Sequence, residues 1–254
     1  MKKLGFLLML IPALMLSQEN KEYAVFENGL ITANPTKIKQ FEAGIAAHNK
    51  KYHAQGIYGA RMYSISNGPN VGKYIWAMGP LPWSAFDNRP ALKGHDDDWN
   101  SNVAPYMLAD GDQTYWKFEA DLSNFPNDFK VNKLLVDMYD IKRFQNGKVK
   151  KLLKKVEKVM KSKYPETTYG MYMNELPSTK DGRDLAMVWF FEKSAWMGND
   201  PKFAKNYEEV HGDGSFTHFL DDWLEVTNGS ESEIWVYRQD LSGLGPEVNA
   251  ASRK

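Results

Sequence analysis

Residues 58–65 read YGARMYSI, and residues 169–176 read YGMYMNEL. Two more segments recur in the same order, namely DDW at 97–99 and 221–223, and an aromatic-rich segment at 115–122 and 234–241. Three landmarks in one order indicate a duplicated unit. A period this long is typical of duplicated domains rather than of a solenoid. The duplication therefore decides the architecture of the chain.

Each copy shows the same order of predicted elements. In the first copy, strands are expected at 23–31, 58–66, 73–79 and 114–122, with helices from Asn34 and Pro35 to near Gly56 and around 97–106. In the second copy, strands are expected at 134–143, 168–176, 185–192 and 233–241, with helices around 149–159 and over 203–226, interrupted at 212–214. Both copies therefore read β-α-β-β-α-β, the order of a ferredoxin-like unit.

The repeat also predicts the boundaries of the parts. We expect a signal peptide at 1–19, a first ferredoxin-like repeat at 20–124, a linker at 125–131, a second repeat at 132–242 and a mobile tail at 243–254. Residues 4–16 are almost wholly apolar and follow Lys2 and Lys3, which is typical of a secretory signal peptide. This run is shorter than the roughly 20 apolar residues that span a membrane. We therefore expect an exported protein, periplasmic or secreted, without a membrane anchor.

The composition excludes several classes of protein. The 32 basic side chains balance the 32 acidic ones, so charge gives no reason to expect a nucleic-acid partner. The chain has no cysteine, which excludes disulfides, thiolate metal sites and a cysteine nucleophile. No phosphate-binding loop and no nucleophile elbow occurs in the sequence.

A tandem of two ferredoxin-like units resembles the dimeric α/β-barrel superfamily, which includes antibiotic-biosynthesis monooxygenases, EthD-like and NIPSNAP-like proteins, and haem-binding chlorite dismutases. The resemblance covers roughly residues 22–241 and implies an α+β fold. It further implies that the two four-stranded sheets form a fused barrel within one chain, a monomer with an internal pseudo-dimer. Small ligands in that superfamily lie between a sheet and its helices. The resemblance supplies no catalytic motif.

Positions that differ between the copies are candidates for a site in one copy. His48 continues an apolar helix face, and its counterpart in the second copy is Val159. Tyr52, one turn later, stands where the second copy has Lys163. Because a buried imidazole needs a polar partner, His48 is a candidate base, metal ligand or substrate anchor. The alternative is a core histidine satisfied by a backbone carbonyl or a tyrosine.

Arg61 is the second unmatched residue, because Tyr172 stands at its place in the second copy. Alternation along a strand puts Arg61 and Tyr63 on one face of the sheet. If helices cover that face, Arg61 joins His48 in a site for an anionic or carbonyl-bearing ligand. If they do not, Arg61 is a barrel or rim residue. His48 and Arg61 are thus the candidate catalytic residues.

Trp76 and Trp83 complete the predicted ligand-binding set of His48, Tyr52, Arg61, Trp76 and Trp83. Trp83 falls where the chain leaves the sheet, and an aromatic platform there suits a flat ring or a sugar; core packing is the alternative. Residues 95–98 read HDDD, but adjacent residues on a helix point in different directions. This segment is therefore interpreted as a solvated face, and no metal site is predicted.

Four functions are consistent with the sequence. The favoured one is an exported protein that binds a small molecule. The second is a cofactor-free monooxygenase that uses His48 with Arg61 or Tyr52 on a phenolic or enolic substrate. The third is a haem-binding barrel with His48 as axial ligand, and the fourth is a purely structural exported protein. Apart from haem in the third, no cofactor is predicted.

Overall fold

The structure is a computed structural model that describes residues 22–253. Eight strands form one closed antiparallel barrel in the order β1-β3-β2-β9-β6-β8-β7-β4. The strands of the first half are β1 (Val25–Ile31), β2 (Ala60–Ile65), β3 (Tyr74–Leu81) and β4 (Asp112–Phe118), and those of the second half are β6 (Lys133–Ile141), β7 (Tyr169–Asn174), β8 (Leu185–Phe191) and β9 (Thr227–Tyr237). The predicted signal peptide at 1–19 lies outside the described residues.

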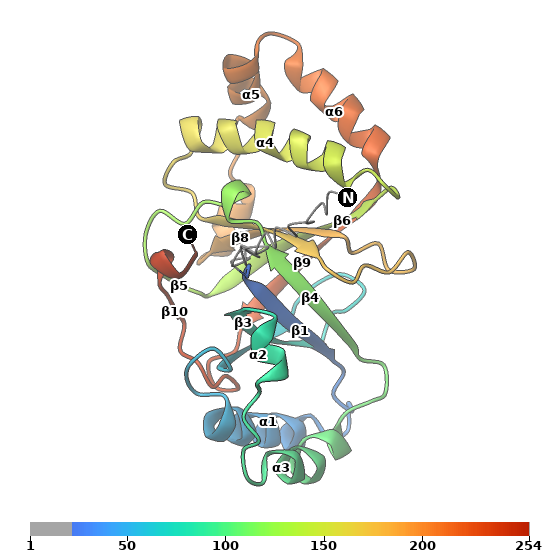
Figure 1. Ribbon diagram of the computed structural model, residues 1–254, viewed down its shortest axis with the longest axis vertical. Helices are drawn as coiled ribbons and strands as arrows, with labels where there is room; N and C mark the ends of the chain where they lie inside the picture. Colours follow the sequence, from blue (N-terminus) through green and yellow to red (C-terminus); the bar gives the residue numbers. More distant parts are fainter. Residues whose placement is uncertain (1–21, 254) are drawn as a thin grey trace, which may run out of the picture.

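Helices cover the outer face of each four-stranded sheet (Figure 1). The first half carries α1 (Ile38–Tyr52), the short α2 (Ser84–Asp87) and α3 (His95–Asn102), and the second carries α4 (Asn146–Lys163), α5 (Phe203–His211) and α6 (Ser215–Val226). In Figure 1, α1 and α3 lie below the barrel, and α4, α5 and α6 lie above it. Each half has the order β-α-β-β-α-β, so the predicted pair of ferredoxin-like units is confirmed.

The two halves complete each other's sheets. Strand β2 pairs with β9 through Tyr63 and Tyr237, and β4 pairs with β7 through Trp116 and Asn174. Both junctions are antiparallel. The predicted fused barrel thus closes within one chain, and each edge strand of one half is covered by an edge strand of the other.

Alternation along the strands separates two kinds of core. On β2, Met62 points outward and packs with Phe41 and Ile45 of α1. The next residue, Tyr63, points inward and packs with Trp235 in the barrel. The barrel interior is therefore one apolar core, and each sheet shares a second core with its own helices.

The segments on either side of the second repeat belong to the folded barrel. The expected linker contains β5 (Phe129–Lys130), which pairs with β10 (Glu247–Val248) near the carboxyl end of the chain. Val248 and Ala250 are buried. The expectation of a mobile tail from residue 243 is therefore wrong, because these apolar side chains pack against the barrel. A two-residue strand gives too short a pattern to be predicted.

A glycine allows the two helices of the first half to touch. A Cβ at Gly44 of α1 would lie 1.9 Å from the backbone oxygen of Asn102, at the end of α3. Such a contact is far shorter than any van der Waals separation, so α3 can approach α1 this closely only because Gly44 has no side chain. This contact holds α3, which begins at His95, against α1.

We expect Gly44→Ala to lower the free energy of unfolding by about 1–3 kcal/mol, because the new methyl group must push α3 away from α1. Gly147→Ala in α4 is the matched control, since a Cβ at Gly147 meets nothing within 4 Å. The control should be neutral or stabilising by about 0.4–1 kcal/mol. Denaturant titration of both variants measures the difference, and equal stabilities would contradict the close approach.

Candidate functional site

His48 lies on the face of α1 that packs against the sheet, as its helical spacing predicts. Its side chain is 1% exposed. Its Nδ1 lies 2.8 Å from Oδ2 of Asp98 on α3, and Asp98 in turn accepts a hydrogen bond from Asn102 through Oδ1. The partner of His48 is thus a carboxylate from the segment that the sequence led us to interpret as a solvated face.

Two further histidines lie against His48. His53 directly follows α1, and its Nδ1 donates to the backbone oxygen of Tyr58 at 2.8 Å. His95 begins α3, and its Nδ1 lies 2.8 Å from a carboxylate oxygen of Asp96. The ring centroids of His53 and His95 lie 5.3 and 4.8 Å from that of His48. We call His48, His53 and His95 the histidine cluster.

The second ring nitrogens of His53 and His95 face each other. Nε2 of His53 and Nε2 of His95 are 3.2 Å apart. Nε2 of His48 is buried and makes no hydrogen bond. One ring nitrogen from each of the three residues lies within 4.8 Å of the others.

Burial decides the charge of the two inner rings. It lowers the pKa of His53 to about 4, and the bond to the carbonyl of Tyr58 offsets only part of this effect. Burial also lowers the pKa of His48, against the opposing effect of Asp98. The hydrogen bond from His48 lowers the pKa of Asp98. At neutral pH His48 and His53 are therefore neutral imidazoles, and Asp98 is an ionised carboxylate.

Tyr52 and Trp76 adjoin the histidine cluster. The Tyr52 ring lies 5.0 Å from the ring of His48, and its hydroxyl is buried without a hydrogen-bond partner. The Trp76 ring lies 5.2 Å from that of His53, and its Nε1 donates to Asn49 at 3.0 Å. The structure thus brings three of the five predicted ligand-binding residues, His48, Tyr52 and Trp76, into one place.

Arg61 lies elsewhere. It lines the barrel interior, on the opposite face of β2 from the helix-packed Met62. Its Nε donates to the backbone oxygen of Gly245 at 2.9 Å, and its terminal nitrogen donates to that of Glu247 at 2.8 Å. Helices cover the opposite face of β2, which bears Met62, so Arg61 does not join His48 and is a barrel residue, the alternative given above.

Trp83 also belongs to a different group of side chains. Its ring lies 5.1 Å from Phe86 and 5.4 Å from Tyr115. Its Nε1 donates to the hydroxyl of Tyr23 at 3.2 Å. Trp83 therefore packs where β4 meets α2 and does not adjoin the histidine cluster.

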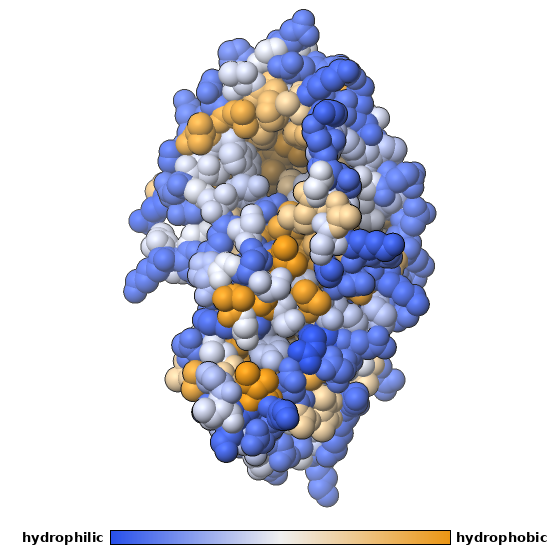
Figure 2. Space-filling view, turned by 180° about the vertical axis from the view of Figure 1, so that it is seen from behind, coloured by the Kyte–Doolittle hydropathy of each residue, from blue (hydrophilic) through white to orange (hydrophobic). Residues whose placement is uncertain are grey.

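The second half holds a large apolar cavity at the corresponding place. It has a volume of about 510 Å³ and lies between the sheet and α4, α5 and α6. Its aromatic lining consists of Tyr139, Tyr164, Trp189, Trp196, Phe203, Phe216, Phe219 and Trp223. Seen from behind, Figure 2 shows an apolar hollow in the upper half of the molecule, where these helices lie. The sequence alone does not predict this cavity, because its lining residues have the apolar pattern of an ordinary core.

The cavity and the histidine cluster occupy equivalent positions. The repeat that aligns α1 with α4 pairs His48 with Val159 and His53 with Tyr164. The DDW segments pair His95 with Phe219. Tyr164 and Phe219 line the cavity, and Val159 is fully buried beside it. All three histidines of the first half are therefore replaced by apolar or aromatic residues in the second.

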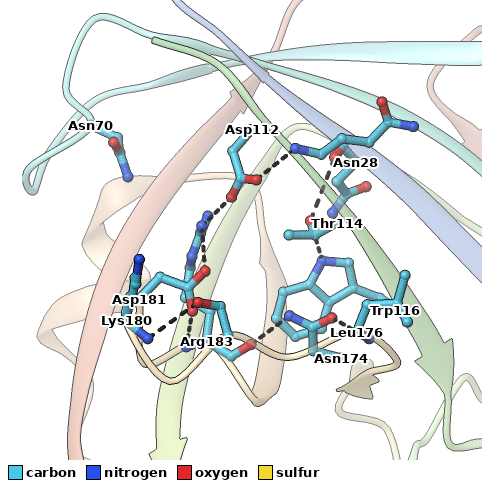
Figure 3. Close-up of polar contacts among 12 residues, drawn as sticks. Asn28, Asn70, Asp112, Thr114, Trp116, Asn174, Leu176, Lys180, Asp181 and Arg183 are labelled. Atoms are coloured by element: carbon cyan, nitrogen blue, oxygen red, sulfur yellow. Dashed lines mark hydrogen bonds and ion pairs between the residues drawn. The ribbon is translucent and has the colours of Figure 1, made fainter.

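The barrel interior leaves less room. Its cavity measures about 110 Å³, and charged residues stand at its polar end. Asp112 and Asp181 both pair with the guanidinium of Arg183, and Trp116 Nε1 donates to Thr114 Oγ1 at 2.8 Å (Figure 3). Because the charges there are paired with one another, this end of the barrel is a self-contained polar network.

The fold is shared with proteins of known structure. Two structures named as putative monooxygenases are similar. The one from Fusobacterium nucleatum has a TM-score of 0.55 and 7% identity, and the match covers 85% of this chain and 93% of that chain. The one from Lactobacillus acidophilus has a TM-score of 0.50 and 11% identity, and the match covers 90% of this chain and 100% of that chain. Chlorite dismutase from Candidatus Nitrospira defluvii in complex with imidazole is also similar, with a TM-score of 0.53 and 6% identity. This match covers 87% of this chain and 94% of that chain. No family model and no curated protein sequence matches the chain.

These similarities show the dimeric α/β-barrel fold that the sequence predicted. At such low identities they show the fold alone, and the chemistry of the site depends on its own residues. No helix within residues 22–253 is long and apolar enough to cross a membrane.

Haem is compatible with this fold, but His48 is not placed to bind it. The rings of Tyr52, His53 and His95 lie about 5 Å from that of His48 and leave no open face for a macrocycle beside it. No histidine lines the large cavity of the second half. No step through haem follows from these residues.

We expect Arg61→Met to loosen the carboxyl-terminal segment and to lower the free energy of unfolding by about 1–2 kcal/mol, because two backbone oxygens lose a charged donor. Hydrogen exchange at residues 245–248 should become faster, since β10 loses its anchor. Arg143→Met is the control, as Arg143 is exposed. Unchanged exchange in the Arg61 variant would show that β5 alone holds the segment.

Proposed function

We propose that this protein binds a small, uncharged and largely aromatic molecule in the cavity of its second half. The observation that carries the proposal is the cavity of about 510 Å³ between the sheet and α4, α5 and α6. Pockets that hold small organic ligands measure about 300–1,000 Å³ and are mostly apolar. A well-packed core leaves no empty space of this size, so core packing alone does not account for it.

The lining indicates the chemistry of the ligand. Trp189, Trp196 and Trp223 offer ring faces for stacking. No charged side chain lines the cavity, and its polar residues are Tyr139, Tyr164 and Thr167. A charged ligand would lose its hydration without gaining a partner, so the site favours a neutral, flat molecule with few hydrogen-bonding groups.

Binding is better supported than monooxygenase chemistry. A cofactor-free monooxygenase needs a base beside its substrate, and the phenols in the lining are the nearest substitute. Burial raises the pKa of Tyr139 to about 12, so that phenol stays protonated at neutral pH and is no base. The hydroxyl of Tyr164 already donates to the backbone oxygen of Pro201 at 2.7 Å. We therefore propose a binding protein, exported under the signal peptide that residues 1–19 predict.

A substitution that fills the cavity tests the proposal. Val156 is buried in α4 and lines the cavity, so Val156→Phe places a ring inside it. We expect the wild type to bind a fluorescent apolar probe, 1-aminoanthracene, and the variant to lose that binding without losing stability. Lys154→Gln, an exposed position of the same helix, is the control and should bind normally.

Probe binding should also raise the stability of the wild type, by about 2.7 kcal/mol at a free concentration of 100 Kd. Thermal unfolding with and without the probe measures this effect. If Val156→Phe binds the probe as tightly as the wild type and is stabilised equally, the ligand does not lie in this cavity and the proposal fails.

A further inference from the structure

The three Nδ1 atoms of the histidine cluster all carry protons. Their partners are carboxylate oxygens of Asp98 and Asp96 and the backbone oxygen of Tyr58, each at 2.8 Å. These oxygens accept hydrogen bonds and have no proton to give, so each ring must donate through Nδ1. The Nε2 atom of a neutral ring held in this way presents a lone pair.

The cluster therefore contains three Nε2 lone pairs for which its own residues provide no donor. Nε2 of His53 and Nε2 of His95 are 3.2 Å apart, and Nε2 of His48 is buried without a hydrogen bond. An unsatisfied buried acceptor destabilises the folded state, and two facing lone pairs repel. A proton added to His95 would satisfy His53 but would leave His48 unpaired. One cation among the three nitrogens satisfies all of them.

The geometry suits a transition metal ion. Zinc binds imidazole nitrogen at about 2.0–2.1 Å, which separates two ligand atoms of a tetrahedral site by about 3.3 Å. The Nε2 atoms of His53 and His95 already have that separation. The ring nitrogens of all three residues lie within 4.8 Å of one another, so a small rotation of the rings completes the set.

The surroundings of the cluster match those of metal-binding histidines. A ligating histidine almost always donates its other ring N–H to a carboxylate or a backbone carbonyl, which holds the ring in place. All three residues of the cluster do so. Asp98 is itself held by Asn102 at 2.9 Å, so it acts as a positioning residue for His48.

We infer that His48, His53 and His95 bind one divalent transition metal ion, with Zn²⁺ as the reference, through their three Nε2 atoms. Three imidazoles leave the fourth position of a tetrahedral ion open for water or a ligand. The Tyr52 ring lies 5.1 Å from that of His95, so this tyrosine borders the proposed metal site. His95 is 31% exposed on its side chain, so the ion reaches the site from the side of α3.

This site is independent of the proposed ligand cavity. It lies in the first half, and its three positions in the second half are Val159, Tyr164 and Phe219, none of which binds zinc. Loss of the metal site should therefore leave probe binding in the second half unchanged. The experiments can therefore distinguish failure of the metal-site inference from failure of the proposed ligand cavity.

Metal titration of the full chain, carrying no histidine tag and first stripped with EDTA, tests the inference. We expect one equivalent of Zn²⁺ to bind by calorimetry, with a raised melting temperature. Co²⁺ at the same site should show the intense visible bands of four-coordinate cobalt. His95→Ala should weaken Zn²⁺ binding by more than about tenfold, and Asp98→Asn, which removes only the positioning carboxylate, by about 10–100-fold.

Controls separate the cluster from other histidines and from misfolding. His211→Ala and His218→Ala remove the two histidines outside the cluster and should leave Zn²⁺ binding unchanged. His48→Val introduces the residue of the second half and should abolish binding while the protein keeps the cooperative thermal unfolding of the metal-free wild type, which confirms that it is folded. The inference is overturned if the wild type binds no stoichiometric Zn²⁺, or if His95→Ala binds it as tightly as the wild type.

Discussion

Closure of the barrel is the constraint on which the rest of the structure depends. A four-stranded sheet has two edges with unpaired backbone groups, and here β2 meets β9 and β4 meets β7. Once the inner faces of both sheets share one core, only the outer faces remain for helices. Any large site between a sheet and its helices must then lie outside the barrel. This explains why the histidine cluster and the apolar cavity lie on opposite sides of it.

The architecture could be predicted from the sequence because the features that specify it, duplicated segments and helical spacing, are periodic. The duplicated segments fixed the two halves, and the helical spacing placed His48 on the buried face of α1. The direction of Arg61 was not decided by alternation, because both faces of β2 are buried, one by α1 and one by the barrel. Only the closure of the barrel, a contact between distant strands, makes that choice.

The histidine cluster was missed for a related reason. His53 lies just after the helix and falls outside its apolar pattern, whereas His95 belongs to a segment distant in sequence. Neither residue has a local signal, since what unites them is the packing of α3 on α1. A comparison of the two halves at every histidine position contains a usable signal, because Tyr164 and Phe219 replace His53 and His95 as Val159 replaces His48.

The two halves differ at a helix position that borders both sites. The counterpart of Gly44 in the second half is Lys155, whose side chain reaches toward Asp222 of α6 at 3.9 Å. Without a side chain at Gly44, α3 lies directly on α1, and the space is filled by imidazoles. In the second half a lysine stands at that place, and a cavity of about 510 Å³ lies between the sheet and α4, α5 and α6. The first half therefore fills the space between its sheet and helices with imidazoles suited to an ion, and the second half leaves a space suited to an organic ligand.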